Sequence, residues 1–593
     1  MQRVLATTLV FSLLSGIAFA SEDLDRALAL VPDDAVGFVA WPSPKKSSSD
    51  CAALLEQIGA GGAMIAGRPI DFFKASFGVG ANFDETAPVV LFGVPAVDAT
   101  ATPDLVFIVG TTDPAAFIQA NLTPEGAPEQ GRFKTADGQV ISARAVGHSI
   151  VASSSHDAVR DYDMTKRASI AARVQGRLTE EEWHSLDRAD FVLWANAAGM
   201  RAGTRIARES APVDADTAVA TTLANSFNAQ FADGVVAIDI DPLGVWARAI
   251  GIAQEGSALA SLAATQAVTP AAKCSRLPGN PFYFATSIDL VGIGGAESLL
   301  DGLALFGVDR EALPAWLLTD AAAVTGVQFA AYPSKLGVAV GGVLNDSALF
   351  IASRNPEGTL ARMKESFLAL QGESGGVKRE AHWTDAKQLK SGAVASAFEL
   401  KETVLDLSKQ APGAEYMRLG KQFIVGVRGL VGLAAVTKGG VVVTFSQRPD
   451  VFGRAMAAGS AGGDIPLSQN ATITSMEEWL PPNRDVEVML GVGRLAMLAS
   501  SIMQGIGSAF GDEAAAAGGM NIQKPDPSLE PVLMAFDVGG GRIDGSLVLP
   551  TGVLKYLSTL YAQQPKGSST PSTTPSEAQE RDLQTEGGDS EFP

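Results

Sequence analysis

The sequence predicts an α+β protein of repeated strand-helix-hairpin modules, in which mainly antiparallel sheets are covered by helices. Short apolar runs alternate along the chain with amphipathic stretches of helical period. Strands also follow one another directly in pairs, and the strict strand-helix alternation typical of a parallel sheet is missing. The same order of elements recurs, which predicts two long related halves and a final short module.

The first long unit is predicted to contain a strand, two helices, two neighbouring strands and a closing helix. Their ranges are 35–41, 49–58, 68–77, 87–94, 105–110 and 114–121. The same order returns over 282–289, 295–306, 310–318, 322–331, 336–343 and 356–370. Two stretches that share one order of elements indicate a duplicated plan.

A shorter unit of strand, helix and hairpin is predicted three times. The opening strands lie at 191–196, 394–400 and 486–492, and the helices at 217–231, 402–428 and 494–510. The hairpins pair 234–241 with 245–252, 433–437 with 441–445, and 531–538 with 543–549. The last two hairpins turn through consecutive glycines, which adopt the positive φ angles that tight hairpins require.

The N-terminus predicts export. Arg3 precedes an uncharged apolar run over 4–17, and the small residues Ala18 and Ala20 fit cleavage after Ala20. The run is too short to span a bilayer, which takes about 20 apolar residues. We therefore expect a signal peptide over 1–20, no transmembrane span in the mature chain, and a periplasmic or extracellular location.

The remaining chain divides by composition and repeat. We expect a first α+β half over 21–270, a second over 275–460 and a C-terminal α+β module over 470–563, with linkers rich in small residues between them. Residues 565–593 are mostly Ser, Thr, Pro, Gly and acidic residues. A segment with so few large apolar side chains cannot bury enough surface to fold, which predicts a disordered acidic tail.

Charge and cysteine content limit the functional classes. The formal net charge is −20, and no dense cluster of Lys and Arg offsets it, so the surface repels nucleic acid. The two cysteines are Cys51 and Cys274. In an oxidising compartment they could form one disulfide. The alternative is two separate buried thiols, because the sequence does not place the two Cα atoms within bonding distance.

Motifs assign no catalytic, cofactor-binding or metal-binding residue, and no cofactor. P-loop, His-Glu-x-x-His and Cys-x-x-Cys patterns do not occur in the sequence. The Gly-x-Ser-x-Gly match at 372–376 follows a predicted helix instead of a strand, so we interpret it as a loop. His148 and His156 flank a serine-rich segment with Asp157 nearby, but His148 and its neighbour Ser149 would face opposite sides of a strand.

Three tryptophans, Trp183, Trp383 and Trp479, precede the opening strands of the short units. Thr179 and Glu182 form a capping-box pattern for a short helix that carries the first of them. We interpret the tryptophans as packing anchors between sheet and helix, with a ligand platform as the alternative.

The predicted helix over 494–510 carries no charge after Arg494. One face of it is lined by Leu498, Ile502, Ile506 and Phe510. This pattern is typical of a core helix packed against its own hairpin, which we favour, or of a lipid or partner surface.

A short turn pattern suggests a family. Residues 30–35 read Leu-Val-Pro-Asp-Asp-Ala just before the first strand, and 481–485 read Pro-Pro-Asn-Arg-Asp before another. This pattern resembles uncharacterised exported bacterial proteins whose modules open on a Pro-Asp-Ala-like turn and an apolar strand. The resemblance implies export, and it carries over no catalytic residue.

These observations leave three functions open. The first is a non-enzymatic exported scaffold or binding protein of the periplasm or cell surface, whose partner is an unknown protein. The second is a carrier of an apolar ligand held between sheet and helices. The third is a hydrolase whose site is assembled from residues far apart in the sequence. We favour a protein that is not an enzyme, because no motif points to a reaction.

Overall fold

The computed structural model describes most of the chain. The described residues are 21–59, 69–95, 102–126, 131–135, 138–186, 188–210, 228–264, 273–295, 323–374, 376–389, 394–405, 414–460, 466–510, 526 and 529–562. The predicted signal peptide, the predicted acidic tail, residues 217–227 of one predicted helix and the helices predicted over 295–306 and 310–318, apart from residue 295, lie outside this part.

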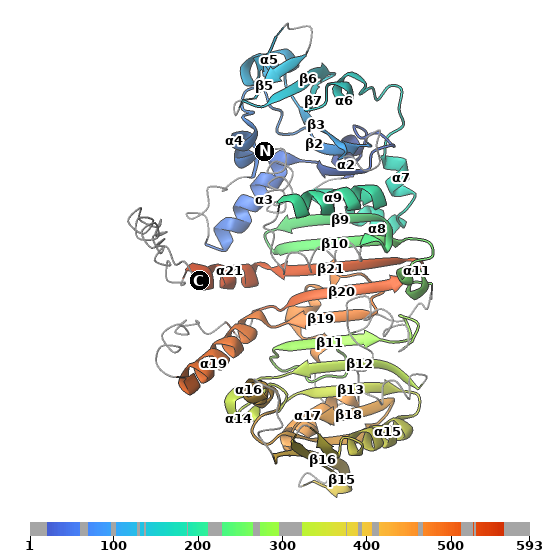
Figure 1. The fold of residues 1–593 in the computed structure, drawn as a ribbon, viewed down its shortest axis with the longest axis vertical. Coiled ribbons are helices and arrows are strands. Elements are labelled where there is room, and N and C mark those ends of the chain that lie inside the picture. Colours follow the sequence, from blue (N-terminus) through green and yellow to red (C-terminus); the bar gives the residue numbers. More distant parts are fainter. Residues whose placement is uncertain are drawn as a thin grey trace, which may run out of the picture.

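The described strands form one continuous sheet of 21 strands, in which all neighbours are antiparallel (Figure 1). In chain order they are β1 (Gly37–Trp41), β2 (Val89–Val94), β3 (Asp104–Gly110), β4 (Thr123–Pro124), β5 (Arg132–Lys134), β6 (Val140–Val146), β7 (Ser149–Ser153), β8 (Phe191–Asn196), β9 (Phe231–Asp241), β10 (Gly244–Ala253), β11 (Phe284–Asp289), β12 (Val324–Ala331), β13 (Ala348–Ser353), β14 (Gly372–Ser374), β15 (Val377–Gln388), β16 (Val394–Val404), β17 (Leu430–Thr437), β18 (Gly440–Thr444), β19 (Val486–Leu490), β20 (Val532–Gly539) and β21 (Arg542–Pro550). Many of these segments are rich in Val, Ile and Phe, which pack well on a pleated surface.

Helices connect the strands and lie on both faces of the sheet. They are α2 (Ser21–Leu28), α3 (Pro44–Gln57), α4 (Pro69–Phe77), α5 (Pro114–Asn121), α6 (His156–Arg160), α7 (Ala171–Gln175), α8 (Glu180–Leu186), α9 (Ala197–Ser210), α11 (Ala258–Leu262), α14 (Val338–Gly341), α15 (Pro356–Leu368), α16 (Ala414–Val425), α17 (Pro449–Gly459), α18 (Ala471–Thr474), α19 (Val492–Phe510) and α21 (Thr551–Ala562), with short 3₁₀ turns η4 (Leu467–Gln469) and η5 (Glu477–Trp479). The coarse α+β prediction is confirmed, with more strand than helix.

The strand order across the sheet differs from the chain order. It runs β4, β5, β6, β7, β3, β2, β1, β8, β9, β10, β21, β20, β19, β11, β12, β13, β18, β17, β16, β15, β14. The last three strands of the chain, β19 to β21, therefore lie between β10 and β11. We call the contact between β10 and β21 the seam.

Three predicted elements are wrong. The strand predicted over 336–343 does not form, and α14 takes its place, with Gly337 and Gly342 at the ends of the helix both at φ +73°. This left-handed region favours glycine and lets the backbone reverse around one helical turn, and the next strand is β13. The helix predicted over 402–428 is shorter, because β16 extends to Val404 and α16 covers only Ala414–Val425. The loop predicted over 372–376 contains β14, which pairs with β15.

Hydrophobic side chains pack against the sheet in three clusters. The largest follows one face along the whole sheet and includes Trp194, Trp246, Leu533, Ala285 and Phe350. The opposite face carries two separate clusters, one beneath α3 and α4 at one end and one beneath α15 at the other. The central strands of this second face lie between the two clusters.

The two cysteines lie on opposite faces of the sheet. Cys51 packs in the cluster beneath α3 and α4, and Cys274 packs in the large cluster of the other face, where it is a free thiol. Burial raises the pKa of Cys51 to about 11 and that of Cys274 well above its usual value. The disulfide that the sequence allowed is not present in this structure, because the sheet separates the two side chains.

The capping box before Trp183 is present and allows a direct test. The backbone N–H of Thr179 donates to Glu182 Oε2 at 2.5 Å, and the N–H of Glu182 donates to Thr179 Oγ1 at 3.2 Å. We expect Thr179→Ala to lower the free energy of unfolding by about 1 kcal/mol, because one helix-end N–H loses its acceptor. Urea denaturation measures this change. Thr179→Ser keeps the hydroxyl and should retain most of the stability, so equal losses for both variants would contradict the assignment.

Candidate functional site

The central strands of the second face carry two rows of apolar side chains. Directly paired residues on neighbouring strands point to the same face, so the register defines each row. One row consists of Val236, Ala249, Gly545, Phe536, Val486, Ile288 and Val327. The next row consists of Ile238, Ala247, Leu547, Met534, Val488, Thr286 and Phe329. We call these two rows the apolar floor.

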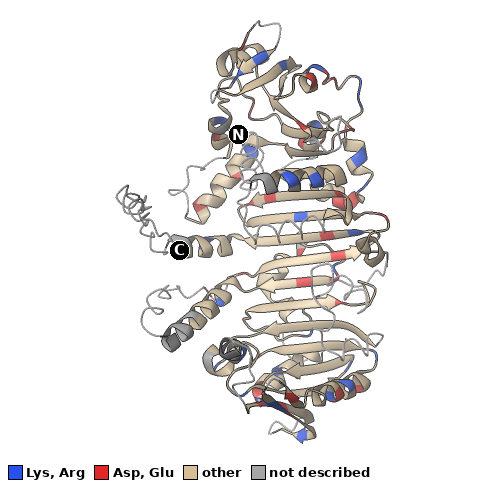
Figure 2. Ribbon diagram, in the orientation of Figure 1, with Lys and Arg blue, Asp and Glu red and all other residues tan. Residues whose placement is uncertain are grey.

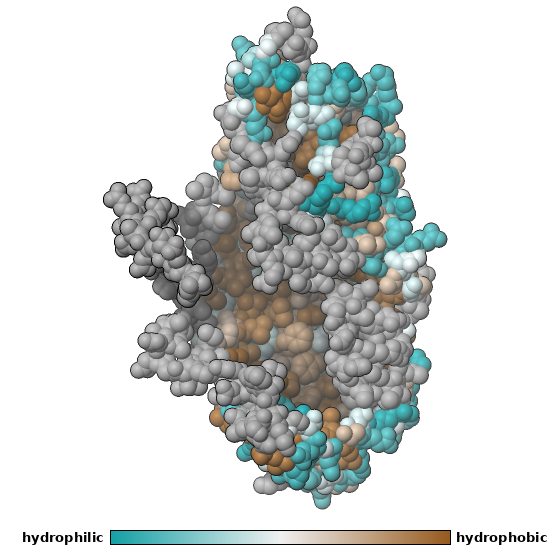
Figure 3. Space-filling model, viewed as in Figure 1, coloured by the Kyte–Doolittle hydropathy of each residue, from teal (hydrophilic) through white to brown (hydrophobic). Residues whose placement is uncertain are grey.

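The apolar floor is accessible. Val236 and Phe536 are 36% and 38% exposed, and most other members are half-buried. The floor crosses seven strands, which at about 4.8 Å per strand makes it roughly 30 Å wide. Figure 3 shows this region as a hollowed brown surface over the central strands. An accessible apolar surface of this width is uncommon on a soluble monomer and usually marks a binding surface.

Charged side chains of the same central strands lie on the other, buried face. Figure 2 shows only a few charged positions on these strands. Among the charged residues of these strands are Arg248 on β10, Asp544 on β21 and Glu487 on β19. The register places all three opposite to the floor, and they are 7%, 5% and 1% exposed. Antiparallel sheets with one open face normally place apolar side chains inward and polar ones outward. Here the covered face carries the charged side chains together with the apolar ones of the large cluster, and the accessible face carries apolar side chains as well.

The helix α19 extends away from one edge of the sheet beside the floor (Figure 1). Its principal contacts within the described chain are with α14 and α21, and Leu495, Leu498 and Ile502 remain half-buried. Among the described contacts, α19 therefore packs on neighbouring helices more than on the strands of its own hairpin, and the side chains of residues 503–510 lie outside the described part. Exposed apolar side chains of the neighbouring helices, Val340 and Ile424, are 50% and 52% exposed.

Two pairs of aspartates occupy matching positions on the buried face. The first pair is Asp190 and Asp239. The Oδ2 atom of Asp190 accepts the backbone N–H of Ile240 at 2.9 Å, and the N–H of Asp190 donates to the carbonyl of Ile238 at 2.7 Å. Burial, with the neighbouring carboxylate of Asp239, raises the pKa of Asp190 well above its usual value. Burial also raises the pKa of Asp239 to about 7.

The second pair, Asp485 and Asp537, repeats this geometry. Asp485 Oδ2 accepts the N–H of Val538 at 2.9 Å, and the N–H of Asp485 donates to the carbonyl of Phe536 at 2.8 Å. Burial raises the pKa of Asp485 to about 6 and that of Asp537 to about 7, where the charge of Asp485 adds to the effect. Both pairs therefore hold protons near neutral pH. Nothing in the sequence pointed to them, because the partners lie about 50 residues apart.

The histidines singled out in the sequence are not brought together with a reachable nucleophile. His148 lies in the turn before β7, where its carbonyl accepts the N–H of Thr111 at 2.8 Å. His156 Nδ1 lies 3.2 Å from Ser142 Oγ, a partner that the sequence did not indicate. Ser142 is only 4% exposed, so its hydroxyl is poorly placed to attack a bound substrate.

The predicted tryptophan anchors have different surroundings. Trp183 is buried, and Trp479 packs on the large cluster, where its carbonyl accepts the indole N–H of Trp246 at 2.6 Å. Trp383 instead lies inside β15, where it stacks on Phe398 with ring centroids 5.7 Å apart. None of the three lies on the apolar floor, which leaves the ligand-platform alternative without support.

Comparisons with known proteins add no further assignment. No family model, curated protein or solved structure matches this chain. In the described ranges, His, Cys, Asp and Glu residues form no group of three or more that could hold a metal ion. Among the described helices, none combines the length and the apolar character needed to cross a membrane.

Proposed function

We propose that this chain is an exported, non-enzymatic binding protein of the periplasm or cell surface, and that the apolar floor binds an apolar ligand. The accessible apolar floor, on strands whose charged side chains all lie on the other face, is the observation that carries this proposal. Water contacts the apolar rows, which is unfavourable, and an apolar ligand that covers the floor would remove this contact.

The size of the floor favours an extended ligand such as a lipid acyl chain. Compact small-molecule sites are deep clefts that enclose most of the ligand. The floor is instead a broad surface that crosses β9, β10, β21, β20, β19, β11 and β12, and Thr286 is its single polar member. A ligand that lies along several strands would bury much more of this surface than a compact one.

A charge placed on the floor should abolish ligand binding. We expect Met534→Glu to weaken binding of a fluorescent fatty-acid probe by at least about tenfold, because the carboxylate would be desolvated against the chain. Titration of the probe against purified protein measures the affinity. The matched control is Leu243→Glu, which adds the same charge at a residue 69% exposed on the turn after β9, away from the floor.

A second readout separates a carrier from a scaffold. Organic extraction of the purified protein, followed by mass spectrometry, should recover lipid in near-stoichiometric amounts. An empty extract together with equal probe affinity for Met534→Glu and the native chain would exclude the apolar ligand. The exported scaffold that binds a protein partner would then be the better proposal.

We also propose that the two halves arose from one duplicated plan. On one side of the seam the strands run β10, β9, β8, β1, β2, β3, and on the other they run β21, β20, β19, β11, β12, β13. The repeated aspartate pairs support this proposal. In this duplicated plan, the counterpart of β8 to β10 is the C-terminal module with β19 to β21. The hairpin at 433–445 is not their counterpart.

Export itself is testable from the mature N-terminus. The predicted cleavage after Ala20 would leave α2 whole, and its Leu24, Ala27 and Leu28 are buried in the large cluster. This supports a mature chain that begins at Ser21.

A further inference from the structure

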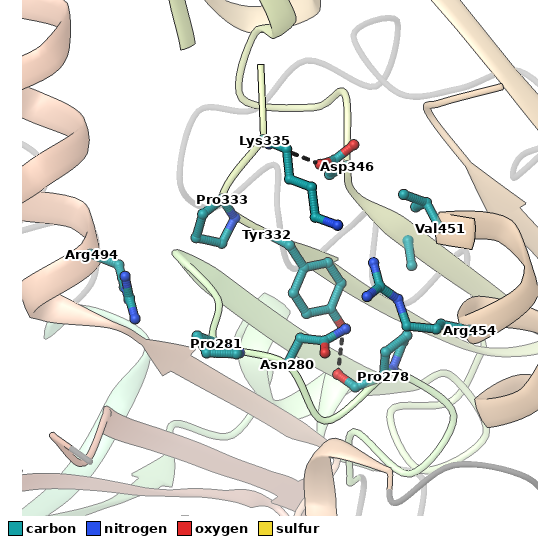
Figure 4. A pocket seen from close by; sticks show the side chains of 11 residues that line it. Pro278, Asn280, Pro281, Tyr332, Pro333, Lys335, Asp346, Val451, Arg454 and Arg494 are labelled. Carbon is teal, nitrogen blue, oxygen red and sulfur yellow. Dashed lines mark hydrogen bonds between the residues drawn. The ribbon is translucent and has the colours of Figure 1, made fainter. Parts of the chain in front are cut away.

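A pocket of about 230 Å³ lies between α17, the first turn of α19 and the segments that flank β11 and β12 (Figure 4). Its charged lining residues are Lys335, Asp346, Arg454 and Arg494. Prolines and the ring of Tyr332 form much of the remaining wall, and the Tyr332 hydroxyl donates to the Pro278 carbonyl at 2.8 Å. These rigid groups keep the pocket open without contributing charge.

The one acidic residue of the lining, Asp346, is paired with an arginine outside the lining. Asp346 is 6% exposed, and its Oδ2 accepts a hydrogen bond from Arg448 Nη1 at 3.1 Å. The backbone N–H of Lys335 also donates to Asp346 Oδ2, at 3.3 Å. Arg448 also pairs with Asp450, so the charge balance of the pocket is best read from its lining, which carries three cations against one carboxylate.

The cationic side chains of the pocket have few acidic partners. Within the described part of the chain, Arg454 and Arg494 form no ion pair or hydrogen bond, and Lys335 Nζ is 3.9 Å from Asp450 Oδ2 on the exposed surface. The protein as a whole carries a net charge of −20, so carboxylates are abundant elsewhere. Two arginines left unpaired around one pocket indicate that a ligand supplies the anion.

The position of Arg494 adds to this field. It lies in the first turn of α19, a helix of 19 residues, where the helix dipole also favours negative charge. We propose that this pocket binds a small oxyanion group, a phosphate or a carboxylate, on Arg454, while Arg494 on the opposite side of the pocket adds positive charge (Figure 4). The site stands apart from the apolar floor and does not depend on the floor binding a ligand.

Isothermal titration with inorganic phosphate tests the pocket directly. We expect saturable binding that Arg454→Gln weakens about tenfold, because it removes charge-assisted hydrogen bonds, and that Arg494→Gln weakens by a smaller factor, because it removes a more distant positive charge. The control is Arg428→Gln, an exposed arginine outside the pocket lining that changes the net charge equally. It should bind phosphate as the native chain does.

A second measurement distinguishes the two sources of the anion. Vesicles of phosphatidylglycerol and of phosphatidylcholine are sedimented with the same four proteins. Phosphate binding without vesicle binding assigns a free anion, whereas binding to phosphatidylglycerol alone, weakened in both pocket variants, assigns a lipid headgroup. No binding in either assay, or binding that both pocket variants retain, overturns the proposal.

Discussion

Asp544→Ala is expected to lower the free energy of unfolding by about 3–5 kcal/mol, because it leaves the Arg248 guanidinium unpaired inside the sheet. Arg248 Nε donates to Asp544 Oδ1 at 2.9 Å, and Nη2 donates to Oδ2. Their side chains are 8% and 7% exposed. Burial raises the pKa of Asp544, and the bonds from Arg248 oppose this shift. The two-point contact requires a carboxylate, so the pair is ionised.

The pair also joins distant parts of the chain. Arg248 lies on β10 and Asp544 on β21, 296 residues later, so both belong to the seam. Glu182 of the capping box contacts the same region, because its Oε2 accepts a hydrogen bond from Arg542 Nη1 at 2.6 Å. Loss of the pair should therefore weaken the contact between the first half and the C-terminal module.

Urea denaturation followed by circular dichroism measures the loss. The combined replacement Arg248→Met with Asp544→Leu should recover most of the stability, because no buried charge remains. Arg160→Ala is the control, since it breaks an exposed pair with Asp161 and should leave the midpoint nearly unchanged. A midpoint for Asp544→Ala equal to that of the native chain would show that the seam is held by backbone pairing alone.

Local elements were predictable from the sequence because local chemistry determines them. The helix predicted over 114–121 is α5, which begins after Asp113, whose side chain accepts the N–H of Ala116. The strand predicted over 35–41 is β1 with small changes at its start. Caps, proline positions and apolar runs act over a few residues, so one sequence contains the information.

The site could not be predicted, because alternation does not say which face is buried. In β21, Arg542, Asp544 and Ser546 alternate with Ile543 and Leu547. The ordinary interpretation places the apolar set inward. In this strand Asp544 and Ser546 are buried together with the apolar Val548. Distant parts of the chain supply partners on this face, because β10 provides Arg248 for Asp544 and α8 provides Glu182 for Arg542. Such pairing depends on strand order, which depends in turn on contacts between residues hundreds of positions apart.

The protein is expected to lose stability as the pH rises from 5 to 8. The pKa is about 7 for Asp239 and Asp537 in the folded protein, and near 3.9 for an aspartate in an unfolded chain. The folded state therefore holds protons that the unfolded chain has released. The stabilisation is complete below about pH 4 and is lost as the pH rises through 7.

Thermal unfolding at pH 5 and pH 8 measures this dependence. Each unit of difference between the folded and unfolded pKa corresponds to about 1.4 kcal/mol, so two such residues should lower the Tm by several degrees. Asp239→Asn and Asp537→Asn should flatten the profile, because asparagine replaces the protonated acid without titrating. Asp161→Asn is the control, since Arg160 lowers the pKa of this exposed residue and it is ionised at both pH values. A Tm that rises between pH 5 and pH 8, or that falls equally in the paired-aspartate variants, would mean that the buried aspartates are ionised in the folded protein.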